Sequence, residues 1–189
     1  MPKKIALFYG HVASNVGDLA INSGTIELLR SVAPKSQIDV VLLNSEKSQF
    51  LELSKLSFIK TGTARLVHFK THSSQISNFL SKPTRLLAES GVEDSDVILL
   101  AAGEHFFRYA NGENSESLFW RSLPALAARE AGKQCILLPS TLGPFEDLPS
   151  RNLPVSLLNL TQVNAVREAR SKSLVEAYTD SSRIPVCLD

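Results

Sequence analysis

Seven short apolar runs recur along this 189-residue chain, and segments of helical length separate most of them. The runs are continuously aliphatic instead of alternating with polar residues, which is typical of strands buried on both faces of a parallel sheet. We expect strands over residues 4–9, 37–43, 64–69, 96–101, 134–139, 163–166 and 184–188. The sequence therefore predicts an α/β fold with a doubly wound, mostly parallel, Rossmann-like sheet.

Helices are expected between these runs, over residues 17–32, 46–55, 74–90, 115–131, 150–159 and 168–179. In the first helix, apolar and small residues recur at helical spacing, which predicts a stripe that faces the core. The stripe consists of Ala20, Ile21, Gly24, Leu28 and Val32. The chain has no internal repeat and no low-complexity segment. The pattern therefore predicts a single Rossmann-like domain across residues 1–189.

The chain finishes at Asp189, directly after the last expected strand and with no closing helix. That is an unusual place for a doubly wound fold to finish. We therefore expect this chain to be the N-terminal half of a larger protein, with the second domain absent from the chain.

Charge and composition exclude several classes of function. The formal net charge is only +1, so there is no electrostatic footprint for a nucleic acid or an anionic membrane. No apolar run approaches the roughly 18 residues of a membrane span, and the N-terminus lacks the features of a signal peptide. Cys135 and Cys187 both lie in apolar runs and predict reduced, buried thiols; no Cys/His cluster has the spacing of a metal site. We expect a cytoplasmic protein without a metal, a nucleic-acid partner or a transmembrane segment.

Ligands of open parallel sheets bind outside the carboxyl ends of the strands. Four polar segments reach that edge in the predicted fold, and they are the places to look for chemistry. They comprise residues 10–18, 102–113, 139–147 and 167–171.

The first segment resembles a phosphate loop but has neither nucleotide fingerprint. Its glycines are seven residues apart and no lysine follows them, so both G-x-G-x-x-G and G-K-[ST] are absent. Asn15 followed by Asp18 has the form of a capping box, and Gly17 allows a tight entry into the helix. The carboxylate of Asp18 would partly neutralise this helix end as an anion site. Two interpretations stay open: a purely capping turn, or the wall of a ligand cleft.

The second segment follows a strand that ends in small residues. Gly103 allows a close approach of the backbone, and Glu104 and His105 come directly after it. A carboxylate beside an imidazole at a strand end is a plausible acid/base pair. The alternative is a solvated loop, because adjacent residues often point apart.

The third and fourth segments offer hydroxyl groups and cations. Ser140 lies at a strand end, ahead of a turn stiffened by Gly143 and a proline; turn chemistry alone is the alternative. Arg167 and Glu168 follow another strand, and Ser171 begins a helix. Arginine at a strand end suits bidentate recognition of a carboxylate or phosphate, whereas a surface ion pair is the alternative.

Taken in order, these short motifs resemble the polysaccharide pyruvyl transferase family. They are an N-x-G-D turn after the first strand, a small-residue strand end with a polar loop, L-P-x-x-x-G-P-F, and R-E-x-x-S. The resemblance extends from about residue 5 to residue 189. Two positions depart from the family pattern: residues 101–103 read Ala-Ala-Gly instead of a glycine-rich run, and Ser140 stands where a glutamine is expected.

The resemblance implies one half of a GT-B-like enzyme that belongs to surface-polysaccharide biosynthesis. Such enzymes move the pyruvyl group of phosphoenolpyruvate onto two sugar hydroxyls as a ketal, with no cofactor beyond the donor substrate. Family members are about twice this long, so this chain alone is expected to be incomplete and inactive. The expected partners are phosphoenolpyruvate and a sugar or polysaccharide acceptor, with a homo-oligomer left open.

The chemistry assigns roles to the candidate residues. Glu104, His105 and Arg167 are the catalytic candidates: the first two as acid or base, Arg167 as an anion clamp. Substrate-binding roles are expected for Asn15, Gly17, Asp18, Gly103, Ser140, Gly143, Glu168 and Ser171. Two other functions stay open, a GT-B glycosyltransferase half that uses a nucleotide sugar and a non-catalytic binding or remnant domain.

Overall fold

The computed structural model describes most of the chain. The described residues are 3–8, 16–43, 59, 62, 64–70, 75–108, 115–145, 156–161, 163–176 and 184–187. The helix expected over residues 46–55 lies outside them.

The fold is built on one sheet in which all the described strand pairs are parallel. The strands are β1 (Lys4–Phe8), β2 (Gln37–Leu43), β3 (Arg65–Phe69), β4 (Val97–Leu100), β5 (Gly103–Arg108), β6 (Gln134–Phe145) and β7 (Val163–Val166). Their order begins β3-β2-β1-β4-β6, and both β5 and β7 pair with β6. The order reverses between β1 and β4, which is the arrangement of a Rossmann sheet and confirms the predicted fold class.

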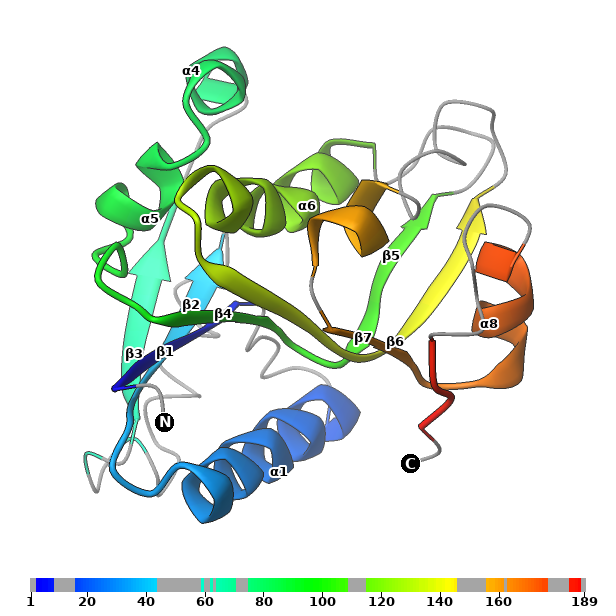
Figure 1. Ribbon diagram of the computed structural model, residues 1–189, viewed down its shortest axis with the longest axis horizontal. Helices are drawn as coiled ribbons and strands as arrows, with labels where there is room; N and C mark the ends of the chain where they lie inside the picture. The colour runs from blue at the N-terminus through cyan, green and yellow to red at the C-terminus, as the bar shows by residue number, and fades with distance from the viewer. Residues whose placement is uncertain are drawn as a thin grey trace.

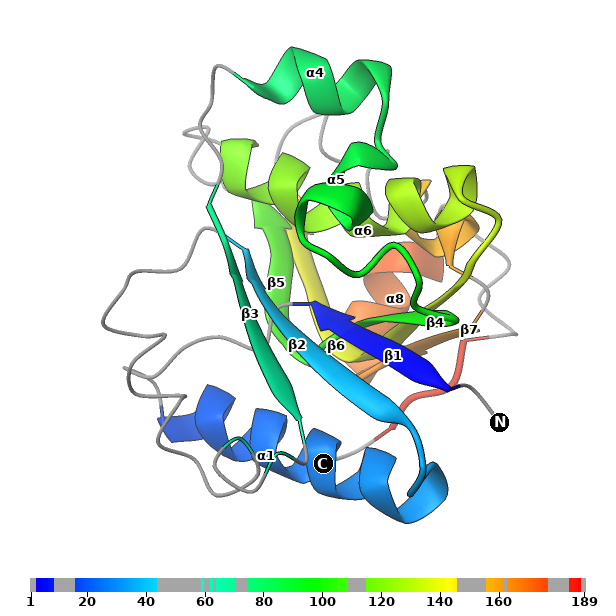
Figure 2. The ribbon, with the colours of Figure 1, turned by 90° about the vertical axis from the view of Figure 1, so that its left-hand side faces the viewer.

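Helices cover both faces of this sheet, as a doubly wound fold requires (Figure 1). They are α1 (Val16–Val32), α4 (Ile76–Ser81), α5 (Arg85–Glu89), α6 (Ser115–Glu130) and α8 (Ala169–Glu176). A further helical turn covers residues 156–160. Turning the molecule shows α1 on one face of the sheet, with α5 and α6 on the other (Figure 2).

Strands β4 and β5 run one after the other along the same edge of β6. Ser140 of β6 is paired with Gly103 of β5 on one side and with Val166 of β7 on the other. Ile136, earlier in β6, is likewise paired with β4 on one side and with β7 on the other. Because β7 pairs with one edge of β6 at both Ile136 and Ser140, β5 continues β4 along the opposite edge. Residues 103–108 of the polar loop expected after residue 101 therefore form a strand.

Strand β6 is longer than expected, since it continues through the predicted turn to Phe145. The turn residues pair with β5 in an irregular register that shifts twice. Pairing with β5 satisfies backbone groups that a free turn would leave to solvent. At the other end of the chain, the strand expected over residues 184–188 is a single bridge between Val166 and Val186.

The stripe predicted to face the core on α1 is wrong. Leu28 and Val32 are 61% and 53% exposed, and Ala20 and Gly24 are exposed as well. Ile26 is the buried apolar residue in the middle of the helix, at 1% exposure. The spacing was helical, but small and apolar residues occur on two sides of α1, so periodicity alone did not decide which side is buried.

The helix expected over residues 74–90 is divided into α4 and α5. Lys82 has φ −150° and ψ 81°, which is not helical, and Pro83 follows it. Proline disfavours the helical conformation in the residue before it, so the break falls where the chain chemistry requires it.

The core is formed where the sheet meets the helices. Residues 5–8 of β1 are all buried, and Phe79 of α4 packs edge-on against Phe69 of β3 and Trp120 of α6, with ring centroids 6.3 Å and 5.5 Å apart. Cys135 is buried in β6, as predicted, and burial raises the pKa of its thiol to about 12. The second cysteine, Cys187, is only half-buried and lies outside the described strands.

Candidate functional site

Three segments far apart in the sequence meet around Ser140 of β6. Gly103, at the start of β5, pairs with Ser140 on one side. On the other side, the backbone N–H of Arg167 donates to the carbonyl oxygen of Ser140 at 3.1 Å. The side chain of Ser140 is fully buried, and its hydroxyl donates to the carbonyl of Leu138 at 2.8 Å. The hydroxyl of Ser140 is therefore bonded to its own strand.

Glu168 is held by two hydroxyl groups. Thr141 Oγ1 donates to Glu168 Oε2 at 3.0 Å, and Ser171 Oγ donates to Glu168 Oε1. The backbone N–H of Leu142 donates to Ser171 Oγ at 2.8 Å. These contacts form a chain from β6 through Ser171 to the carboxylate and back to β6. Both oxygens of Glu168 thus accept hydrogen bonds from the protein itself.

The local sequence explains why this network forms at the start of α8. Glu168 directly precedes the helix, and its carbonyl accepts from the N–H of Lys172 at 3.2 Å, which is the first helical turn. A carboxylate at a helix N-terminus is stabilised by the helix dipole. Ser171 is 1% exposed, so its hydroxyl needs the partners that Glu168 and Leu142 provide. The Arg-Glu-x-x-Ser pattern therefore ties α8 to β6.

Gly143 allows α8 to approach β6 closely. Its φ of +86° is in the region that favours glycine, and a Cβ placed there would lie 2.7 Å from Leu174 Cδ1 of α8. The Gly143–Pro144 peptide bond is cis. The backbone at this position is consequently part of the helix packing, and a ligand contact of Gly143 remains a prediction.

The structure brings six of the predicted site residues into one region at the carboxyl-terminal half of β6. They are Gly103, Ser140, Gly143, Arg167, Glu168 and Ser171. Glu104 and His105 belong to β5 by their backbone, and Glu104 pairs with Thr141; their side chains lie outside what the structure describes.

Of the polar segment over residues 10–18, the structure describes only residues 16–18. Helix α1 begins at Val16, so Asn15 occupies the preceding position, which lies outside the described residues. Gly17 and Asp18 are in the first turn of α1; Gly17 is exposed and the side chain of Asp18 is outside the description. Their capping and ligand-binding roles both stay predictions.

Thr141 offers a second hydroxyl at the expected strand end, next to Ser140, but it is not among the predicted site residues. Its partner Glu168 is 27 residues away, and the segment between them is read as turn, helix and strand. The adjacent Ser140 was selected because strand ends bind ligands. The contact of Thr141 with Glu168 becomes predictable only when β6 is known to continue past residue 139.

No group of three or more His, Cys, Asp or Glu side chains in the described ranges is placed to hold a metal ion. None of the described helices is long and apolar enough to cross a membrane.

Comparison with known proteins gives one family and a likeness to solved structures. The sequence model of the polysaccharide pyruvyl transferase family matches residues 15–189. A search of curated proteins finds no match. Among solved structures, the chain is similar to a protein from Listeria monocytogenes described as a UDP-N-acetylglucosamine 2-epimerase, with a TM-score of 0.57 and 13% identity over 97% of this chain and 44% of that one.

A second solved structure, described as a short-chain dehydrogenase/reductase from Sinorhizobium meliloti, gives a TM-score of 0.49 and 11% identity, covering 100% of this chain and 96% of that one. At 13% identity, the likeness to the Listeria protein concerns the fold alone. The chain spans less than half the length of that protein.

Proposed function

The chain belongs to the polysaccharide pyruvyl transferase family, and on that premise we propose that its protein transfers the pyruvyl group of phosphoenolpyruvate onto two hydroxyls of a sugar. The observation that carries the proposal is the meeting of Gly103, Ser140 and Arg167 next to the carboxyl ends of β4 and β7, within the matched residues. These residues come from three of the motifs that carry the family resemblance. Carboxyl ends of parallel strands are also where such sheets bind ligands.

The reaction converts an enol phosphate into a ketal without any change of oxidation state overall. The methylene carbon of phosphoenolpyruvate takes a proton and becomes a methyl group, and its neighbouring carbon becomes electrophilic. Two sugar hydroxyls form bonds to that carbon and lose their protons. The bond from that carbon to the phosphate oxygen breaks, and the electron pair leaves with inorganic phosphate. The protein must supply an acid, a base and cations for two anionic groups.

Arg167 is the proposed clamp for the carboxylate or phosphate of the donor. Its guanidinium can recognise either group in a bidentate manner. The N–H of its backbone is tied to Ser140, which fixes where the side chain starts. Glu168 follows directly, and its carboxylate already accepts from Thr141 and Ser171. We therefore assign Glu168 a positioning role, in which it holds both α8 and the neighbouring Arg167 in place.

The remaining roles follow from the family motifs. We propose Glu104 or His105 as acid/base, and Asn15, Gly17 and Asp18 as the acceptor side of the cleft. A second domain is proposed to complete the donor site, since this chain spans less than half of the solved protein that it is similar to. We also propose that the protein acts in the cytoplasm, together with its donor and its sugar substrate.

The test compares two neighbouring arginines in the complete protein. Arg167→Ala should weaken phosphoenolpyruvate binding by about tenfold or more, because a charge-assisted hydrogen bond contributes roughly 1.5–3 kcal/mol. Arg170→Ala is the matched control, since Arg170 is exposed and lies in the first turn of α8. Calorimetric titration measures both. Wild-type affinity in the Arg167 variant would remove the clamp assignment.

The same titration separates the two other functions. A glycosyltransferase half would bind a nucleotide sugar in preference to phosphoenolpyruvate, and competition between the two donors reveals this. A non-catalytic domain would bind neither.

A further inference from the structure

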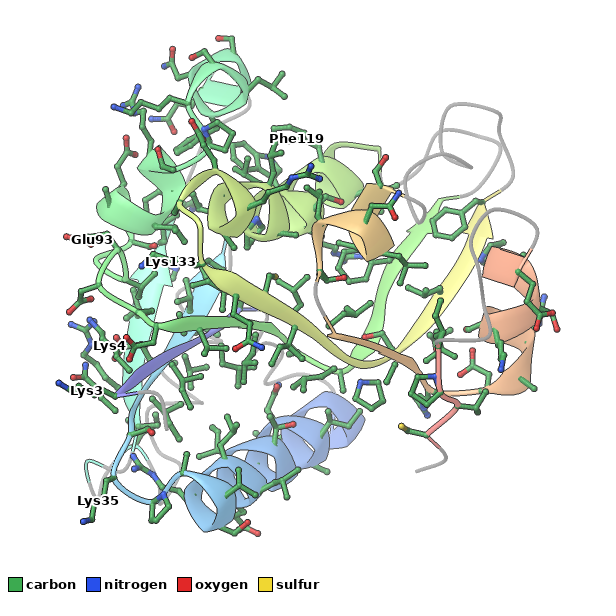
Figure 3. All side chains as sticks on the ribbon, viewed as in Figure 1. Lys3, Lys4, Lys35, Glu93, Phe119 and Lys133 are labelled. Carbon is green, nitrogen blue, oxygen red and sulfur yellow. The ribbon has the colours of Figure 1, made fainter. Side chains whose placement is uncertain are left out.

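A cavity of about 690 Å³ opens at the amino-terminal edge of the sheet, away from the strand ends discussed above. It lies where α1 ends and where β2 and β3 begin. Figure 3 shows Lys35, which borders the cavity, on the same side of the molecule as Lys3 and Lys4 at the start of β1. The described lining residues are Arg30, Lys35, Ser36, Gln37, Ile38, Ile59, Gly62, Ala64, Arg65 and Leu66.

The lining contains three cations, Arg30, Lys35 and Arg65. It contains no acidic residue among the residues that the structure describes. One buried carboxylate, Asp39, lies behind Arg65. Asp39 also lies 3.4 Å from Lys4 Nζ, so among the described residues Arg30 and Lys35 have no carboxylate partner of their own. A chain with a net charge of only +1 thus concentrates positive charge at this place.

Arg65 is held in a fixed orientation. Its Nε and Nη2 atoms both donate to the carboxylate of Asp39 at 2.8 Å, and Nη2 also donates to the carbonyl of Gly91 at 3.1 Å. The hydrogen bonds to Asp39 raise the pKa of the Arg65 guanidinium above its ordinary value, against the smaller opposing effect of burial. The bidentate pair fixes the plane of the guanidinium before any ligand arrives.

Arg30 has no carboxylate partner within the described part of the chain. Its Nη1 donates to the carbonyl of Ser36 at 2.7 Å, and its Nε is buried without an acceptor. The residue is half-buried, so its positive charge is only partly solvated. The carbonyl end of α1 compensates a fraction of that charge. An anion in the cavity would compensate the rest. Lys35, exposed and without an ion pair among the described residues, would face the same anion.

We propose that this cavity binds the phosphate group of a small phosphorylated molecule. Arg30 and Lys35, which have no carboxylate partner in the part of the chain that the structure describes, match a dianionic phosphate better than the single charge of a carboxylate, and arginine suits phosphate geometry. Ile38, Ile59 and Leu66 provide an apolar wall for an uncharged part of the ligand. The volume lies within the range of about 300–1,000 Å³ that is usual for small-molecule sites.

The test titrates the full chain with pyrophosphate in a calorimeter. We expect Arg30→Gln to weaken binding by about tenfold and Lys35→Gln to weaken it several-fold, because each removes a charge-assisted contact. Arg129→Gln, which removes an equal charge from the exposed end of α6, should leave the affinity unchanged. Circular dichroism verifies that each variant is folded.

A parallel arm distinguishes a soluble ligand from a lipid headgroup. Vesicles of phosphatidylcholine with and without phosphatidic acid are sedimented with the wild type and the Lys35→Gln variant. Pyrophosphate binding that depends on Arg30 and Lys35 supports a site for a soluble phosphorylated ligand. If pyrophosphate does not bind, but the protein sediments with phosphatidic acid vesicles in a manner that depends on Lys35, the site binds a lipid phosphate. The proposal is overturned if neither probe binds, or if binding persists unchanged in both variants.

Discussion

Ser171 shows how much of this site depends on one buried hydroxyl. It accepts a hydrogen bond from the N–H of Leu142 and donates one to Glu168, and both Ser171 and Leu142 are 1% exposed. Removing the hydroxyl leaves a buried N–H with no acceptor and a carboxylate with one donor fewer. The consequence should be a loss of stability and a loosening of α8 against β6.

We expect Ser171→Ala to lower the free energy of unfolding by about 1–3 kcal/mol, which is the usual cost of an unsatisfied buried donor. Urea denaturation measures the change. Ser173→Ala is the matched control: Ser173 is exposed in the same helix, and its replacement should change stability by no more than about 0.5 kcal/mol. Equal effects of the two substitutions would refute the structural role of the Ser171 network.

The sequence allowed the position of several site residues to be predicted, but not their contacts. Arg167 follows an apolar run, so its place directly after β7 could be predicted, whereas Ser140, expected at a strand end, lies inside β6 because that strand continues to Phe145. The contact between Thr141 and Glu168 could not, because it depends on β6 continuing to Phe145. Which partner a hydroxyl finds is a tertiary property that strand patterns do not contain.

Three strands are joined at their amino-terminal ends by charges around Asp39 of β2. Its carboxylate accepts from Arg65 of β3 and lies 3.4 Å from Lys4 Nζ of β1. Burial alone would raise the pKa of Asp39, but hydrogen bonds from Arg65 and Gln37 and the neighbouring positive charges outweigh it and hold the pKa below its ordinary value of 3.8. This network therefore stabilises the folded state only while Asp39 is ionised.

The lowered pKa of Asp39 makes the stability of the folded state depend on pH. The folded state holds Asp39 ionised more strongly than the unfolded chain does, so the stabilisation is complete above about pH 4 and is lost as the pH falls through the lower folded-state pKa. We expect Asp39→Asn to lower the free energy of unfolding at pH 7 by about 2–3 kcal/mol, since Arg65 loses its partner but is half-exposed.

Urea denaturation of wild type and variant between pH 7 and pH 2.5 measures this effect. The difference between the two stability curves should narrow as the pH falls below about 4. A constant difference across the whole range would show that Asp39 does not contribute through its charge.

The strands that could be predicted from the sequence are those with a clear apolar pattern. Strands such as β1 and β4 are short and continuously apolar, and they were located to within one or two residues. Strand β5 (GEHFFR) is polar at its start, and its pairing partner lies more than 30 residues later. The break before α5 had a visible signal, because Pro83 stands inside the expected helix.

The whole molecule presents two different edges of one sheet. At the carboxyl-terminal edge, residues from β5, β6 and the start of α8 meet around Ser140. At the amino-terminal edge, Arg30, Lys35 and Arg65 line a cavity. The parallel topology causes this separation, because it puts all strand ends of one kind on one side. The two proposals can consequently be tested independently in the same protein.

Formation of a pyruvate ketal tests the central claim most directly. The complete protein is incubated with phosphoenolpyruvate and a panel of sugar acceptors, and ³¹P NMR follows phosphate release while mass spectrometry follows the acceptor. The account predicts that inorganic phosphate and an acceptor carrying one pyruvate ketal appear together in equal amounts, and that Arg167→Ala lowers both. Phosphate release without any ketal, or ketal formation at the wild-type rate in the Arg167 variant, would contradict it.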